Sequence, residues 1–155
     1  MTPHDLADEH AIRTLTACYT DAINRADIDD IARVYDDEAV FTMMDRPSVV
    51  GRTAILDTLR ATVARYQLIM QLLHSGVVQI DGDRARARWQ VTELQIMNDG
   101  QSRFVAGRYE DEHVRCDDGW RFARRTFTAR YLGDIDLSSG ARPDPPALFP
   151  LWRPR

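Results

Sequence analysis

The chain has 155 residues, with 24 carboxylates against 20 cationic side chains and a formal net charge of −4, and all of the cationic side chains are arginines. The absence of lysine excludes Schiff-base chemistry and a phosphate-binding loop of the Gly-Lys-Ser/Thr kind. The length suits one domain, and arginines interleaved with acids argue against a nucleic-acid partner.

Three amphipathic helices are predicted in the first part of the chain. Thr2, Pro3 and Asp5 form a typical helix start, and apolar residues at helical spacing extend this helix to about Asn24. A second helix follows the capping residue Asp27, with Ile28, Ile31, Ala32, Val34 and Tyr35 on its apolar face. After a short strand at residues 39–44, Gly51 opens the third helix.

From Leu68 onward the apolar residues alternate with a period of two. Four strands are predicted at about 70–80, 84–97, 102–116 and 119–132, and each short joint pairs an Asp or Asn with a glycine. Joints this short make the strands antiparallel. The fold class is therefore α+β, a curved antiparallel sheet wrapped around three N-terminal helices, with a cavity between the two layers.

Residues 133–155 are predicted to be an extension of the domain formed by residues 1–132. The extension is rich in proline and cannot be regular structure, yet residues 147–152 are too apolar for a solvated tail. We expect it to dock over the pocket mouth or on a neighbouring subunit.

No stretch resembles a secretory or membrane-spanning segment, so a cytoplasmic protein without a membrane partner is expected. Cys18 and Cys116 lie in no metal-binding or redox spacing and are interpreted as free thiols. No metal-ligating pattern or cofactor motif stands in the sequence, so neither a metal nor a cofactor is expected.

Several strings resemble the SnoaL-like branch of the nuclear transport factor 2-like superfamily. They are Tyr35-Asp36-Asp37-Glu38-Ala39-Val40-Phe41, Val50-Gly51-Arg52-Thr53-Ala54-Ile55, Gly107-Arg108-Tyr109-Glu110-Asp111 and Asp118-Gly119-Trp120-Arg121-Phe122. The pattern is most similar to the hexachlorocyclohexane dehydrochlorinase and scytalone dehydratase type. One such scaffold carries many reactions, so the resemblance is more specific for fold than for chemistry.

The resemblance implies a catalytic pair made of a histidine on the first long strand and an aspartate at the end of the first helix. The histidine matches His74, whereas the aspartate position holds Asn24. The family's arginine in the last strand matches Arg125, and its first-helix lysine falls on Tyr19.

His74 is the only histidine within an apolar strand, where it is either a hydrogen-bonded core residue or a base. Asn24 would hold it without supplying charge. Three readings remain: Asp21 or Asp27 supplies the charge, the chemistry needs only a weak base, or the site binds without catalysing.

Strand alternation adds Glu93, which shares a face with Trp89 and Val91. An inward Glu93 is an acid, a base or a counter-ion, or simply a salt-bridge partner of Arg125. The substrate pocket is predicted to be lined by Tyr19, Met43, Trp89, Val91, Glu93, Val105, Tyr109 and Phe127.

These residues predict a cofactor-independent lyase or isomerase that abstracts a proton from a small, hydrophobic, cyclic substrate. His74 would be the base, Asn24 would orient it and Arg125 would stabilise developing negative charge. The alternative is a non-catalytic small-molecule binding or assembly module. A polar stripe on the outer sheet face (Arg86, Arg88, Gln90 and Thr92) suggests a homo-oligomer.

Overall fold

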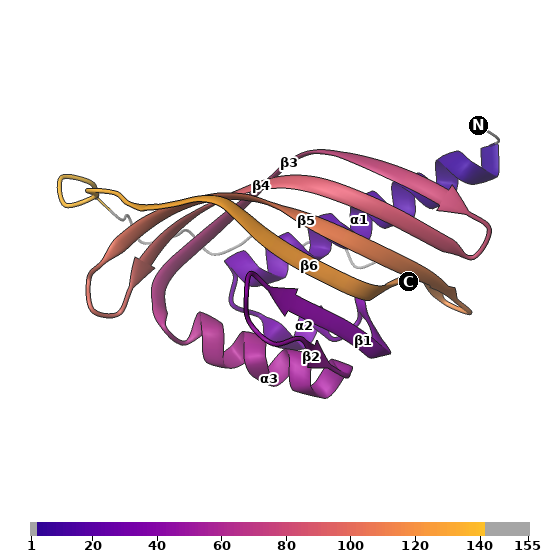
Figure 1. Cartoon of the computed structure of the whole chain (residues 1–155), viewed down its shortest axis with the longest axis horizontal. Coiled ribbons are helices and arrows are strands. Elements are labelled where there is room, and N and C mark those ends of the chain that lie inside the picture. The colour runs from indigo at the N-terminus through magenta and orange to yellow at the C-terminus, as the bar shows by residue number, and fades with distance from the viewer. Residues whose placement is uncertain (1–2, 142–155) are drawn as a thin grey trace.

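A computed structural model of the chain describes residues 3–141 and has the expected α+β architecture (Figure 1). Three helices occupy the first half together with two short strands, and four long strands follow. In chain order the elements are α1 (Pro3–Asn24), α2 (Ile28–Ile31), β1 (Tyr35–Met43), β2 (Val49–Val50), α3 (Arg52–Val63), β3 (Tyr66–Asp81), β4 (Arg84–Met97), β5 (Ser102–Cys116) and β6 (Gly119–Asp134).

The strands form one six-stranded sheet in the order β2-β1-β6-β5-β4-β3. The four long strands are the predicted antiparallel meander. β1 joins β6 in parallel, with Phe41 opposite Arg125, so the complete sheet is mixed. β2, which is only two residues long, pairs with β1 and was not predicted.

The second helix is shorter than predicted. Asp27 caps α2 as expected, because its side chain accepts a hydrogen bond from the backbone of Asp30 at 3.2 Å. The helix ends at Ile31. The chain then joins the sheet, because the backbone N–H of Phe122 donates a hydrogen bond to the Val34 carbonyl at 2.7 Å. Tyr35 therefore begins β1 instead of ending a helix.

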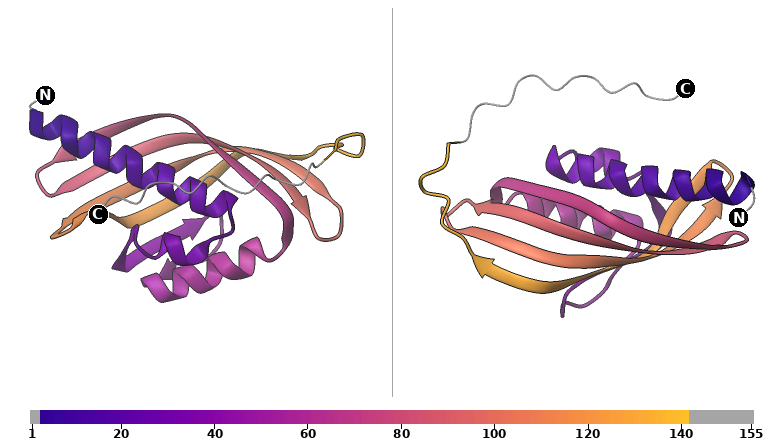
Figure 2. Two further views of the ribbon diagram at one scale, coloured as in Figure 1. Left: turned by 180° about the vertical axis from the view of Figure 1, so that it is seen from behind. Right: turned by 90° about the horizontal axis from the view of Figure 1, so that it is seen from above.

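The helices lie against one face of the curved sheet, called here the inner face (Figure 2). α1 packs along β3 and β6, and α3 packs beside β1. The buried core between these layers is built from large side chains, the most completely enclosed being Ile12, Tyr19, Ile31, Tyr35, Phe41, Ile55, Trp89, Val91 and Phe122.

A bulge in β6 places three large side chains on the inner face where strict alternation would divide them. Asp111 pairs with Arg125, but His113 two residues later pairs with Phe122, so β6 has one extra residue. Trp120 and Phe122 are consequently buried on the same face as Arg125.

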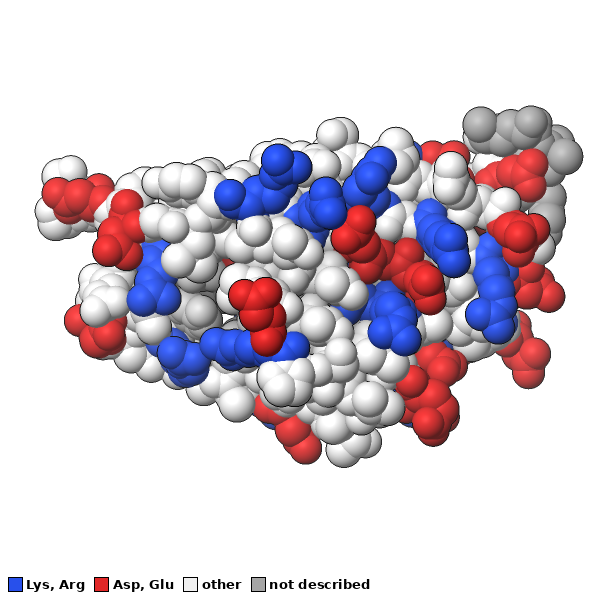
Figure 3. All heavy atoms as spheres, viewed as in Figure 1, with Lys and Arg blue, Asp and Glu red and all other residues white. Residues whose placement is uncertain are grey.

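The outer face carries charges of both signs, interleaved over the part seen in Figure 3, together with exposed apolar side chains of β3 such as Leu72 and Val77. Arg86, Arg88 and Gln90 are exposed there, and the predicted homo-oligomer stays a prediction. Within residues 3–141 no helix has the length and apolar character needed to cross a membrane. Both cysteines are free thiols. The docking predicted for the C-terminal extension concerns residues 142–155, which lie outside the described part.

Candidate functional site

A partly enclosed cavity of about 120 Å³ lies between α1, α3 and the inner face of the sheet. Its volume suits about one six-membered ring, since a cavity of ~150 Å³ can hold benzene. Half of its lining residues are apolar: Ile23, Phe41, Met43, Met44, Leu59, Val63, Ile69, Val105, Phe127 and Leu132. The remaining lining is polar or charged: Tyr19, Arg46, Thr62, Arg65, Tyr66, Gln71, Glu93, Gln95, Arg103 and Tyr109.

Glu93 is the only carboxylate among these lining residues, and it is held from two sides. The Gln71 side-chain amide donates to Glu93 Oε1 at 2.7 Å, and the Gln95 amide donates to Oε2 at 2.6 Å. The Gln71 amide also donates to the Tyr109 hydroxyl at 2.9 Å. Cross-strand pairing brings Gln71 of β3 directly opposite Glu93 of β4, so the arrangement follows from the register of the sheet.

Burial raises the pKa of the Glu93 carboxyl above its ordinary value of 4.5, although the hydrogen bonds from Gln71 and Gln95 oppose the shift. Glu93 is 8% exposed. A buried carboxyl group whose pKa is raised holds a proton more readily than an exposed one, and it can pass a proton to or from a molecule bound beside it. Glu93 is therefore the group in this cavity best suited to proton transfer.

Arg125 lies behind the cavity wall, where it is completely buried. Its guanidinium carbon is 3.7 Å from the ring centre of Tyr109 and 4.1 Å from that of Tyr19. A guanidinium over two ring faces is stabilised by cation–π attraction. Arg125 does not line the cavity, whereas Tyr19 and Tyr109, the two rings that it contacts, do.

The carboxylate nearest to Arg125 is Asp111, with Arg125 Nε 3.6 Å from Asp111 Oδ1, and not Glu93. Neither side chain has a hydrogen bond, and both ring nitrogens of buried His113 also lack one, within the described part of the chain. Alternation along β5 from Tyr109 is enough to place Asp111 on the inner face. Extended by two residues, the same alternation places His113 on the inner face as well. In the sequence, the charged residues around His113 suggest instead that it is exposed.

The structure does not bring His74 to the cavity. His74 lies exposed on the outer face of β3, and its Nε2 is 2.8 Å from Thr92 Oγ1. Leu73 pairs with Val91 on the inner face, so the next residue points outward, and the strand bulges before Gly76. Gly76 permits this bulge because the Trp89 ring occupies the place of a side chain, 2.0 Å from where a Cβ would stand.

Asn24 is also placed apart from His74, because its side chain is bonded to the backbone of β3. The Asn24 Oδ1 atom accepts a hydrogen bond from the backbone N–H of Gln71 at 2.6 Å, and Asn24 Nδ2 donates one to the backbone carbonyl of Gln71 at 2.9 Å. β3 is the edge strand of the sheet, so the two bonds give partners to a backbone N–H and a carbonyl on its open side. Asp21 and Asp27, the alternative charges, both bind Arg25.

An Asn24→Asp variant is expected to lose about 1–2 kcal/mol of stability. A carboxylate accepts from the Gln71 amide but cannot donate to its carbonyl, and it repels that oxygen. Urea denaturation measures the change. An Asn24→Asp variant that is as stable as the wild type would contradict this role for Asn24.

Of the predicted pocket residues, the structure gathers Tyr19, Met43, Glu93, Val105, Tyr109 and Phe127 around the cavity. Trp89 and Val91 are buried on the same face but outside the lining. Gln71, Gln95 and Arg103 were missed. Gln95 could have been found, because it continues the alternation that places Glu93 on the inner face.

Asp111 and His113 predict opposite pH dependences of stability. Burial raises the pKa of Asp111 from 3.8 to about 6, with Arg125 opposing the shift, so its contribution to stability is lost as the pH rises through this interval. Burial, helped by the Arg125 charge, lowers the pKa of His113 from 6.5 to about 3, so its contribution is gained with rising pH over that range.

Relative to the wild type, Asp111→Asn is therefore expected to gain on the order of 2 kcal/mol in its free energy of unfolding between pH 4 and pH 6. The stability of His113→Gln should fall as the pH rises from 4 to 6, because this variant keeps the contribution of Asp111 and lacks the opposing contribution of His113. Urea denaturation at stepped pH measures both. Two variants whose stability changes in the same direction with pH would contradict these buried charge states.

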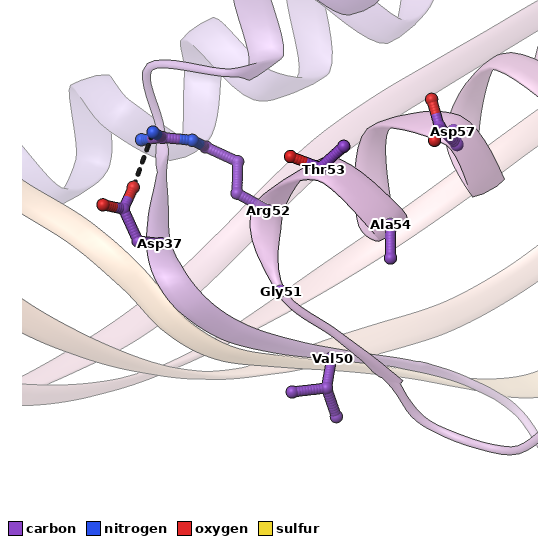
Figure 4. A pocket seen from close by; sticks show the side chains of 7 residues that line it. All are labelled: Asp37, Val50, Gly51, Arg52, Thr53, Ala54 and Asp57. Atoms are coloured by element: carbon purple, nitrogen blue, oxygen red, sulfur yellow. Dashed lines mark ion pairs between the residues drawn. The ribbon is translucent and has the colours of Figure 1, made fainter.

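A second hollow, of about 460 Å³, lies on the surface around the start of α3 (Figure 4). It is larger than the cavity but more open, and its charged groups are already in ion pairs, Arg52 with Asp37 and Asp57 with Arg60. Arg52 reaches across it to Asp37, with a nitrogen–oxygen distance of 2.5 Å. The enclosed cavity with its buried carboxylate is therefore the better candidate site. Within residues 3–141 no three His, Cys, Asp or Glu side chains gather as metal ligands would.

A family model described as SnoaL-like domain matches residues 4–126. An uncharacterized protein of Mycobacterium tuberculosis is 28% identical over 127 residues, which cover 80% of this chain and 86% of that protein. Among solved structures, a Novosphingobium aromaticivorans protein proposed to be an aromatic ring hydroxylase is 27% identical, with a TM-score of 0.80 and coverage of 89% of this chain and 98% of its own.

Two further structures share the fold at lower identity. Hexachlorocyclohexane dehydrochlorinase LinA-type3 of Novosphingobium barchaimii is 21% identical with a TM-score of 0.80, covering 92% of this chain and 97% of its own. A protein of Novosphingobium aromaticivorans proposed to be a scytalone dehydratase is 18% identical with a TM-score of 0.81, covering 88% and 93%. At such identities the likeness concerns the fold and not the reaction.

Proposed function

The chain belongs to the SnoaL-like family, and we propose that it catalyses a proton transfer in its enclosed cavity, as a lyase or isomerase acting on a small cyclic substrate. Solved structures of similar fold include a dehydrochlorinase and a proposed dehydratase. The observation that carries the proposal is the Glu93 carboxyl, buried in the cavity wall with both oxygens hydrogen-bonded.

In this proposal Glu93 takes the part that the resemblance gave to His74. As a carboxylate it removes a proton from a ring carbon of the bound molecule. The amides of Gln71 and Gln95 fix its orientation. The Tyr109 hydroxyl, held by Gln71 and lying beside Arg125, is placed to donate a hydrogen bond to the negative charge that develops.

The proposal is tested by deuterium uptake. Small ring ketones such as cyclohexanone and 2-methylcyclohexanone exchange the hydrogens next to their carbonyl group with D2O when a base removes them. The purified protein should accelerate this exchange for ketones that fit the cavity. Exchange no faster than in buffer across the whole panel would contradict the proposal.

A second candidate is a small-molecule binding module without catalysis. The separation of His74 from Asn24 favours it, because the pair of histidine and first-helix residue that the resemblance implies is not assembled in this structure. The same panel separates the candidates. A binding module would bind ring ketones, as measured by calorimetry, without accelerating their exchange.

A further inference from the structure

The mouth of the cavity carries three arginines from three separate segments. Arg46 follows β1, Arg65 follows α3, and Arg103 lies at the start of β5, and all three line the cavity. Arg46 and Arg65 are exposed. The cavity lining thus carries three arginines and one carboxylate, that of Glu93, although the whole chain has a net charge of −4. This local excess of positive charge requires a reason.

The carboxylate of the cavity does not neutralise these arginines. Both Glu93 oxygens accept hydrogen bonds from glutamine amides, and no ion pair joins Glu93 to an arginine within the described residues. Gln95 pairs with Arg103 across the strands and stands between it and Glu93 along β4. The negative and positive groups of the cavity are therefore kept apart.

Arg103 is the best fixed of the three and retains unused donor capacity. Its Nη2 donates to the Gln101 side chain at 3.2 Å, and its nearest carboxylate oxygen belongs to Asp134, 3.9 Å from Nε. Nε is buried and has no hydrogen bond in the described part of the chain. The Asp134 carboxylate is at ion-pair distance from this nitrogen but too far away to accept a hydrogen bond, so an anion bound in the cavity can supply the missing acceptor.

We propose that the ligand of this cavity is a small amphipathic anion, one apolar ring that carries an acidic group. The acidic group binds Arg103 with support from Arg65 and Arg46, and the ring enters the cavity beside Glu93, against the apolar part of the wall. Glu93 lies on β4, and Arg103 lies on β5 opposite Gln95, which is the next inner-face residue of β4 after Glu93. Two residues along a strand span roughly 7 Å, a distance that a substituted single ring also spans. This inference rests on the proposed function only in that it names the ligand of the same site.

The test compares 4-methylbenzoate with 4-methylbenzamide, which share ring and size but differ in charge. Calorimetric titration should give about tenfold tighter binding of the acid, the contribution of a charge-assisted hydrogen bond. Arg103→Gln should remove most of this preference, and the exposed Arg65→Gln, which does not threaten folding, should reduce it. Arg88→Gln, an exposed arginine on the outer face, is the matched control and should leave the preference unchanged.

Equal affinity for acid and amide, binding of neither at millimolar concentration, or a preference that survives both cavity variants would overturn the inference. Its failure is distinguishable from that of the proposed function. Proton exchange that depends on Glu93 can persist without any preference for an anion. A preference that depends on Arg103 can likewise persist in a protein that catalyses no exchange.

Discussion

A Glu93→Gln variant is expected to lose about 10²- to 10⁴-fold of the ring-ketone exchange rate while it keeps its fold. Glutamine has nearly the same shape but cannot take up a proton. Folding should survive because Gln71 still has an oxygen to bond and no buried charge remains to be desolvated. Exchange rates measured by NMR, together with urea denaturation of the same samples, separate lost chemistry from lost structure.

His74→Ala is the matched control for this prediction. The imidazole lies on the outer face and its hydrogen-bond partner is Thr92, so its removal should change the exchange rate by less than about twofold. The reverse result, with His74→Ala inactive and Glu93→Gln active, would restore the histidine mechanism that the resemblance implies and remove Glu93 from the chemistry.

An Arg125→Met variant is expected to destabilise the protein by about 3–5 kcal/mol at neutral pH. Methionine fills a similar volume between the tyrosine rings, but Asp111 is left buried beside no positive charge. The loss of cation–π contacts with Tyr19 and Tyr109 adds to this cost. Denaturant unfolding measures the change.

Two further variants show whether the Asp111 charge is the cause. Arg125→Met combined with Asp111→Leu should be more stable than Arg125→Met alone, because the uncompensated carboxylate is gone. Arg124→Met, next to it in sequence but exposed and 3.9 Å from Glu112, should cost less than about 0.5 kcal/mol. Additive effects of the two core substitutions would show that Arg125 and Asp111 do not interact.

The long strands and their faces could be predicted where one face is distinctly small or polar. In residues 84–93 alanines alternate with arginines before Trp89, so the sequence alone places Glu93 on the inner face. The parallel pairing of β1 with β6 could not be predicted, because it joins residues such as Phe41 and Arg125 that lie far apart in sequence. The end of α2 depends on the same long-range contact.

The position of His74 could not be predicted because β3 is apolar on both faces from Leu68 to Leu73, so alternation gives no direction. Its orientation follows from the register with β4, and the bulge beside it depends on the fit of Trp89 over Gly76. Gln71 was hidden for the same reason, although it binds both Glu93 and Tyr109.

The most direct measurement of the central claim is the titration of the Glu93 side-chain carboxyl carbon by NMR, with Glu93→Gln used to assign the signal. We expect a Glu93 pKa above the ordinary glutamate value of 4.5, because burial disfavours the charged form. The exchange rate should rise with pH around that same pKa, since the carboxylate is the base. A Glu93 pKa at or below 4.5, or an exchange rate that follows a different group, would show that Glu93 is not the base.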